Sequence, residues 1–93
     1  MALHFSWDPR KAAANARKHG VKFEEAATAF ADPRSLTIPD PEHSQAEDRY
    51  LLLGTSHRDR LVVVVHVERH GDEIRIISAR PASRAERRTY TDA

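Results

Sequence analysis

The chain has 93 residues and no cysteine, and its 15 Lys and Arg residues nearly balance 14 Asp and Glu residues. A chain of this length buries roughly 60–65% of its unfolded surface, enough for one core but not for two lobes with a deep cleft. A composition that is 40% hydrophobic and 31% charged excludes a disordered tail and a membrane protein. We therefore expect one globular domain over residues 1–93.

Targeting and redox signals are absent from the sequence. The longest apolar run, Leu61 to Val65, is too short to cross a bilayer. The segment Met1–Trp7 lacks the basic stretch and apolar core of a secretory signal. The lack of cysteine excludes disulfides, thiol catalysis and thiolate metal ligands. These features predict a cytoplasmic protein without a membrane partner.

Charge is distributed unevenly along the chain. Residues 4–22 carry five bases and one acid, residues 23–48 carry one base and seven acids, and residues 74–93 carry five bases and two acids. If the two basic ends meet in space, they form a surface able to hold a polyanion such as a nucleic acid. The alternative is an ordinary solvated surface of mixed charge.

Two helices are predicted in the N-terminal third. Asp8 supplies a capping oxygen and Pro9 suits the first helical position, so a helix runs from Pro9 to about His19 and ends at Gly20. A second set of apolar residues has the spacing of one buried helical face, and Asp32-Pro33 stops it. This set is Phe23, Ala26, Ala27 and Phe30.

From residue 35 the pattern predicts strands. The expected ranges are Ser35–Ile38, Tyr50–Ser56, Arg60–Glu68 and Glu73–Ala79. The third is rich in valine at both parities, which is typical of a central strand covered on both faces. Pro39–Ala46 has no apolar pattern and is predicted to be an exposed, mobile loop. Ser83 and Glu86 form a capping box, which predicts a short helix from Arg84 to about Tyr90.

Gly71-Asp72 is expected to be the two-residue turn of an antiparallel hairpin. That turn sets Glu68 opposite Arg75 and His66 opposite Ile77, so one face of the hairpin is polar and the other is apolar. We assign the apolar face to the N-terminal helices and expect a ligand on the polar face. A slip of one residue would exchange the two faces.

The densest basic cluster lies near the C-terminus and consists of Arg80, Arg84, Arg87 and Arg88. Guanidinium groups bind phosphate oxygens bidentately and keep their charge. The cluster therefore fits a nucleic-acid surface, although a solvated helix with internal ion pairs explains it equally well. Tyr90 beside it either stacks on a base or docks the last helix onto the core.

His66 and Glu68 lie two residues apart on a predicted strand and so share a face. They fit a general acid and base couple, whereas a half-buried histidine and an ion pair between Glu68 and Arg75 are the structural alternative. We find no third ligand at a telling spacing and predict no metal site.

Scattered motifs, taken together, resemble the BrnT family of type II toxins. They are Trp7-Asp8, Lys11, Asn15, Lys18-His19-Gly20-Val21, Phe23-Glu24-Glu25-Ala26, Asp32-Pro33, Arg75-Ile76-Ile77-Ser78-Ala79-Arg80, Glu86-Arg87 and Tyr90. The resemblance covers nearly the whole chain. It implies a RelE-like α+β fold in which two N-terminal helices pack on a central antiparallel sheet of about four to five strands, followed by a short C-terminal helix.

The resemblance also implies a function. RelE-like ribonucleases cleave RNA without a metal or other cofactor and so inhibit translation. A BrnA antitoxin, similar to ribbon-helix-helix proteins, neutralises the toxin and contacts the promoter DNA for the complex. We expect RNA and such an antitoxin as partners here. The alternative is a toxin-like module that binds a partner or nucleic acid without catalysis.

The residues fit metal-free cleavage, in which the ribose 2′-OH attacks the adjacent phosphorus. Such a site needs a proton acceptor, a proton donor and cations for the developing charge. In this hypothesis the catalytic residues are His66, Glu68, Arg75, Arg80 and Tyr90. The residues expected to bind nucleic acid are Lys11, Lys18, Arg84, Arg87 and Arg88. The role of His66 rests on the assignment of the hairpin faces and not on the resemblance.

Overall fold

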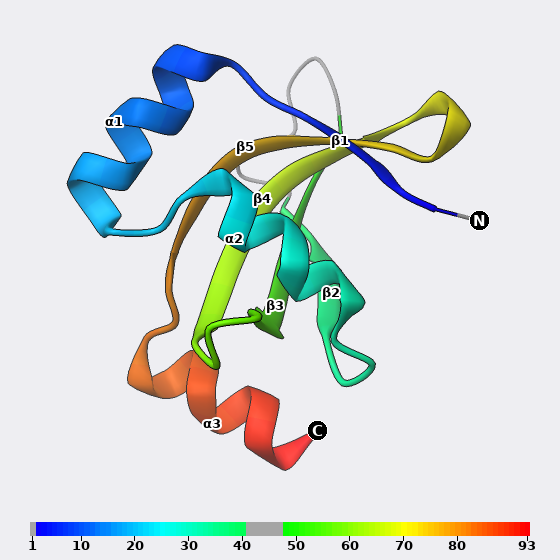
Figure 1. The fold of residues 1–93 in the computed structure, drawn as a ribbon. Coiled ribbons are helices and arrows are strands. Elements are labelled where there is room, and N and C mark those ends of the chain that lie inside the picture. Colours follow the sequence, from blue (N-terminus) through cyan, green and yellow to red (C-terminus); the bar gives the residue numbers. More distant parts are fainter. Residues whose placement is uncertain (1, 41–47) are drawn as a thin grey trace.

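The centre of the molecule is a five-stranded sheet with the strand order β1-β5-β4-β3-β2. The computed structural model describes residues 2–40 and 48–93. The strands are β1 (His4–Ser6), β2 (Leu36–Pro39), β3 (Arg49–Thr55), β4 (Leu61–Arg69) and β5 (Glu73–Pro81). The helices are α1 (Pro9–His19), α2 (Phe23–Thr28) and α3 (Arg84–Asp92). In Figure 1, α2 lies in front of β4, and α3 lies at the end of the sheet far from the β4–β5 hairpin.

Local signals place α1 as predicted. The Asp8 side chain accepts a hydrogen bond from the backbone N–H of Arg10, and Pro9 occupies the first turn. Gly20 ends the helix at φ 70°, in the left-handed region that glycine enters without steric cost. Asn15 is the buried residue of this helix, and it hydrogen-bonds to Ala79 of β5. The helix is thereby fixed to one face of the sheet.

The second predicted helix is also confirmed, in two parts. After α2 the chain tightens into the 3-10 turn η1 (Ala29–Ala31), which ends at Asp32. Phe23, Ala26 and Ala29 are fully buried and pack against the valines of β4. Phe30 packs edge-on against Phe5 of β1, with ring centroids 5.2 Å apart. Together α1, α2 and η1 cover one face of the sheet.

The predicted hairpin forms, but its turn is longer than expected. The turn is η3 (His70–Asp72), in which both Gly71 and Asp72 have positive φ, and Arg69 pairs with Glu73. Glu68 therefore faces Ile74 rather than Arg75. The predicted register at the tip of the hairpin is wrong because three residues, not two, connect the strands.

A β-bulge restores the predicted register farther along the hairpin. His66 pairs with Ile76, whereas Val65 pairs with Ser78, so Ile77 is the extra residue on β5. Val64 then faces Ala79, as the sequence indicates. The extra residue interrupts the alternation of side chains along β5. Two residues on opposite sides of the bulge therefore share a face only when their sequence numbers differ by an odd number.

The predicted assignment of the faces is wrong. The face that carries Val62, Val64 and His66 is the one covered by α1 and α2, where its valines join Ile74 and Ile76 in the main core. The opposite face carries Leu61 and Val63, on which α3 packs through Tyr90. Valines at odd and at even positions of β4 are buried, because helices pack on both faces of the sheet.

One strand, β1, was not predicted from the sequence. β1 has three residues and pairs in parallel with β5, so the sheet is mixed rather than wholly antiparallel. Three residues are too few to show an alternating pattern. Apart from Pro39 and Asp40, the predicted loop at residues 39–46 lies outside the described residues. None of the helices in the described part of the chain is both long and apolar enough to cross a membrane.

Candidate functional site

Polar side chains gather on the sheet face opposite α1 and α2, in the half nearest the β4–β5 turn. The register places them in two rows that cross neighbouring strands. The first row is His4, Glu73 and Arg69. The second row is Ser6, Arg75, Val67 and Arg49. We refer to these two rows as the arginine face.

Contacts within the arginine face orient its carboxylate. The Ser6 hydroxyl donates a hydrogen bond of 2.6 Å to Glu73 Oε2. Arg75, two residues along the same strand, is partly exposed, and its side chain makes no hydrogen bond or ion pair with another residue of the described segments. Its guanidinium is thus available to an anion. A carboxylate, an imidazole and an available cation lie within two adjacent rows.

Arg80 lies on the same face, roughly 17 Å farther along β5. It donates two hydrogen bonds to Glu86, at 2.7 and 2.8 Å, in a bidentate pair. The hydrogen bonds from Arg80 lower the pKa of Glu86 from 4.5 to about 2. Glu86 also completes the capping box with Ser83. Arg80 therefore fixes the start of α3 to β5.

The predicted nucleic-acid-binding residues divide between the two sides of the molecule. Arg84, Arg87 and Arg88 are exposed on α3. Lys11 and Lys18 are exposed on α1, which packs on the other face of the sheet. The hypothesis of one basic surface built from both ends of the chain is therefore wrong.

Tyr90 docks α3 onto the sheet. Its hydroxyl donates a 2.6 Å hydrogen bond to Asp32 Oδ2 and accepts one of 3.2 Å from the Thr55 hydroxyl. The guanidinium of Arg34 lies 5.6 Å from the centre of its ring. Of the two alternatives for Tyr90, these contacts match the docking role.

His66 and Glu68 lie on the face covered by α2, apart from Arg75 and Arg80. His66 is fully buried, edge-on to Phe30 at 4.8 Å and stacked on Tyr50 at 5.9 Å between ring centroids. Burial lowers the pKa of His66, although a hydrogen bond to Val64 and the nearby Glu68 carboxylate oppose this. The five predicted catalytic residues therefore do not converge on one site.

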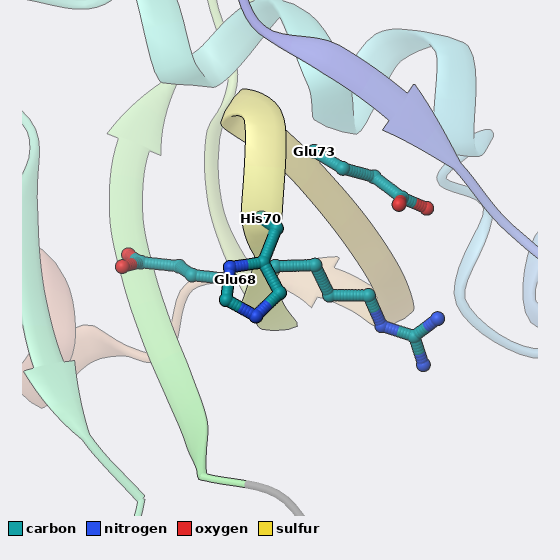
Figure 2. A pocket seen from close by; sticks show the side chains of 4 residues that line it. Glu68, His70 and Glu73 are labelled. Carbon is teal, nitrogen blue, oxygen red and sulfur yellow. The ribbon is translucent and has the colours of Figure 1, made fainter.

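The turn of the hairpin leaves an open hollow of about 680 Å³, lined by Glu68, Arg69, His70 and Glu73. Figure 2 shows Glu68 and Glu73 pointing to opposite sides of the hairpin, with His70 between them. Side chains that diverge in this way do not enclose a reacting group. Within residues 2–40 and 48–93, no three His, Asp or Glu side chains are grouped as metal ligands would be.

Sequence reasoning missed His4, Ser6, Arg49 and Glu73. His4 and Ser6 belong to the short strand β1, and Arg49 is one residue before the predicted start of its strand. Glu73 was placed on a strand but not in a site. The available signal was its position two residues before Arg75, which puts both side chains on one face.

The fold is that of a small α+β protein whose sheet carries arginines, a histidine and a carboxylate on one face, with further arginines on an adjoining helix, an arrangement suited to a polyanion. Comparisons with known proteins identify the family. The family model described as "Ribonuclease toxin, BrnT, of type II toxin-antitoxin system" matches residues 7–86, so the chain belongs to the BrnT family. It is accordingly a ribonuclease toxin of a type II toxin-antitoxin system.

A solved structure has the same fold. The crystal structure of the Brucella abortus ribonuclease toxin BrnT aligns with a TM-score of 0.69 and 21% sequence identity. The alignment covers 89% of this chain and 100% of the Brucella chain. None of the curated sequences compared with the chain matches it. The predicted α+β fold and family are thus confirmed.

Proposed function

We propose that the chain cleaves RNA without a metal ion, on the arginine face. The ribose 2′-OH loses its proton and attacks the adjacent phosphorus, the bond to the 5′-oxygen breaks, and that oxygen takes up a proton. The products are a 2′,3′-cyclic phosphate and a 5′-hydroxyl end. This reaction needs a base, an acid and a cation held in one place.

We assign these three roles to neighbours on β1 and β5. Glu73 accepts the 2′-OH proton, because the Ser6 hydroxyl already orients its carboxylate. His4 lies beside Glu73 in the register and supplies the proton to the leaving oxygen. Arg75, the next residue on the same face of β5, stabilises the charge that develops on the phosphorus oxygens.

The remaining basic groups bind the flanking RNA. The exposed residues Arg84, Arg87 and Arg88 of α3 contact phosphates of a strand that runs along β5 toward the helix. Arg80 holds α3 in position through Glu86. In this scheme Tyr90 is a docking residue, and His66 and Glu68 take no part in the bond change.

The proposal extends to the partners and the location of the chain. We propose that a BrnA-type antitoxin neutralises the chain in the cytoplasm and supplies the contacts with promoter DNA. Support comes from the family model, whose description includes a toxin-antitoxin system.

The observation that carries the proposal is Arg75, an available cation beside an oriented carboxylate. Arg75→Ala should lower the rate of RNA cleavage roughly a hundredfold to a thousandfold, as removal of one preorganised donor does in other enzymes. The matched control is Arg17→Ala, because Arg17 is an exposed arginine on α1. Cleavage is measured on a labelled RNA in excess chelator, and the ends of the products are analysed.

Three results would contradict the proposal. One is full activity of a folded Arg75→Ala variant, and another is loss of cleavage by the wild-type chain in chelator. The third is a 3′-hydroxyl product, because attack by the 2′-OH cannot produce it. Circular dichroism and thermal unfolding of each variant separate a lost site from a lost fold.

A further inference from the structure

A second pocket adjoins the hollow at the turn, with which it shares Glu68, Arg69 and Glu73, and opens on the sheet face that carries α2. It has a volume of about 260 Å³ and crosses the strands where the cover of α2 and η1 ends at Phe30. Leu52 and Ile74 form apolar wall, and His66 and Glu68 form polar wall. We call it the hairpin-end pocket.

His66 brings an unused hydrogen-bond acceptor to this pocket. Its Nδ1 lies 3.3 Å from the carbonyl oxygen of Val64, which can only accept, so the proton of the neutral ring is on Nδ1. The lone pair is then on Nε2, which is buried and has no hydrogen-bond partner in the described part of the chain. A buried acceptor without a hydrogen bond lowers the stability of the fold, so a ligand that donates a hydrogen bond to it would bind favourably.

Glu68 adds a second acceptor beside the first. Its Oε2 lies 3.5 Å from His66 Nε2, and its side chain is 52% exposed. Neither group donates to the other while the carboxylate is ionised and the ring is neutral. A ligand with several N–H groups in one plane would satisfy both acceptors once Glu68 turns outward. The guanidinium of arginine has this geometry and donates only.

The charge and shape of the pocket favour a cationic ligand. Its described lining residues include the acidic Glu68, Asp72 and Glu73 and the basic Arg69; the Glu73 carboxylate is held by Ser6 on the other face, so Glu68 and Asp72 supply the negative charge here. Carboxylates in this excess disfavour a nucleobase, because a base in RNA carries phosphates with it. The ring of Phe30 forms part of the wall, and guanidinium groups stack on aromatic rings.

We propose that the hairpin-end pocket receives an arginine side chain of a partner protein, the antitoxin that neutralises this toxin. The guanidinium donates to Glu68 and to His66 Nε2, and it lies against Phe30. The pocket shares Arg69 and Glu73 with the arginine face, so a partner seated there blocks the end of the surface proposed to bind RNA. The identity of the partner rests on the proposed toxin-antitoxin function, whereas the arginine pocket does not.

Blocked Gly-Arg-Gly, Gly-Lys-Gly and Gly-citrulline-Gly peptides test the pocket on the full chain. Each is titrated while the ¹⁵N resonance of His66 Nε2 is followed by NMR. The arginine peptide should move this resonance and bind roughly tenfold more tightly than the lysine peptide, and citrulline should not bind. Glu68→Gln should weaken arginine binding roughly tenfold. Glu24→Gln, which changes an exposed carboxylate on α2, should leave it unchanged.

Three outcomes overturn the inference: no shift at His66 with the arginine peptide, equal binding of arginine and citrulline, or displacement of the arginine peptide by guanosine monophosphate. The last would identify a base pocket instead. Because the titration does not depend on cleavage, an inactive chain that binds the arginine peptide refutes the proposed function alone. An active chain that does not bind it refutes this inference alone.

Discussion

The Asn15 side chain hydrogen-bonds to three backbone groups outside its own helix. Its amide donates to the carbonyls of Val21 and Ala79, at 2.9 and 2.8 Å, and its oxygen accepts from the Ala79 N–H at 3.0 Å. One residue thus fixes the loop after α1 and the middle of β5 to the same helix. Ala12 of α1 packs against the core, and Asn15 fixes the position of the helix on the sheet.

Replacing Asn15 should therefore destabilise the whole fold. Asn15→Ala leaves the buried Ala79 N–H without a partner and should lower the free energy of unfolding by about 2–4 kcal/mol. Urea unfolding monitored by circular dichroism measures this change, with Arg17→Ala as the exposed control on the same helix. A loss below about 0.5 kcal/mol would mean that water replaces the amide without cost.

At the scale of elements, α3 is fastened at both ends by polar contacts. The pair of Arg80 and Glu86 holds its start, and the hydrogen bond from Tyr90 to Asp32 holds its last turn. Between them, α3 covers Leu53 and Val63 with few apolar side chains of its own. The attachment of α3 should therefore respond to pH more than that of α1, which Asn15 holds through uncharged hydrogen bonds.

The pKa of Glu86, lowered to about 2 in the folded chain, sets the pH range of this response. A lowered folded pKa gives stability that is complete above about 4.5 and is lost as the pH falls through about 2. Glu86→Gln keeps the capping box but loses the ion pair, so near neutral pH it should cost about 0.5–1 kcal/mol. Urea unfolding at several pH values should show this difference vanish toward pH 2. A difference that persists there would mean that the ion pair is not its source.

At the scale of the whole molecule, the two basic segments of the sequence face opposite ways. α1 packs with the main core on one face of the sheet, and α3 packs on the other. An RNA strand on the arginine face therefore meets the arginines of α3 and not the lysines of α1. The charge pattern alone could not show this, because it does not record which face of a sheet a helix covers.

The salt dependence of RNA binding tests this arrangement. With an uncleavable 2′-O-methyl RNA, Arg84→Gln combined with Arg88→Gln should reduce the slope of log affinity against log salt by about 1.4, the value for two lost phosphate contacts on a single strand. Lys11→Gln combined with Lys18→Gln should leave the slope as it is. Equal reductions would mean that the RNA contacts both faces.

Local signals predicted most of the fold. Asp8, Pro9 and Gly20 define α1 because caps act within a single turn. Ser83 and Glu86 define the start of α3 in the same way. β1 was not predicted because its three residues adopt the strand conformation through pairing with β5, which is distant in the sequence.

The candidate site was predicted in part. Arg75 was selected and lies on the arginine face, whereas His66 and Glu68 were grouped with it and lie on the other face. The error arose at the turn, where His70, Gly71 and Asp72 connect the strands and Arg69 pairs with Glu73. Gly and Asp are also the residues that favour a two-residue turn, so their presence did not reveal the longer connection. Because side chains alternate between the two faces of a strand, an error of one residue at the turn assigns the residues that follow to the wrong face.

The bulge at Ile77 makes the length of β5 a functional variable. Arg75 and Arg80 are five positions apart, an odd number, and in a strand without a bulge their side chains would point to opposite faces. They share a face because β5 contains one residue more than the stretch of β4 that it pairs with. Deleting that residue would turn one of the two arginines toward the helices without changing either of them. In this hairpin a one-residue gap between relatives thus alters the chemistry of the surface more than many substitutions would.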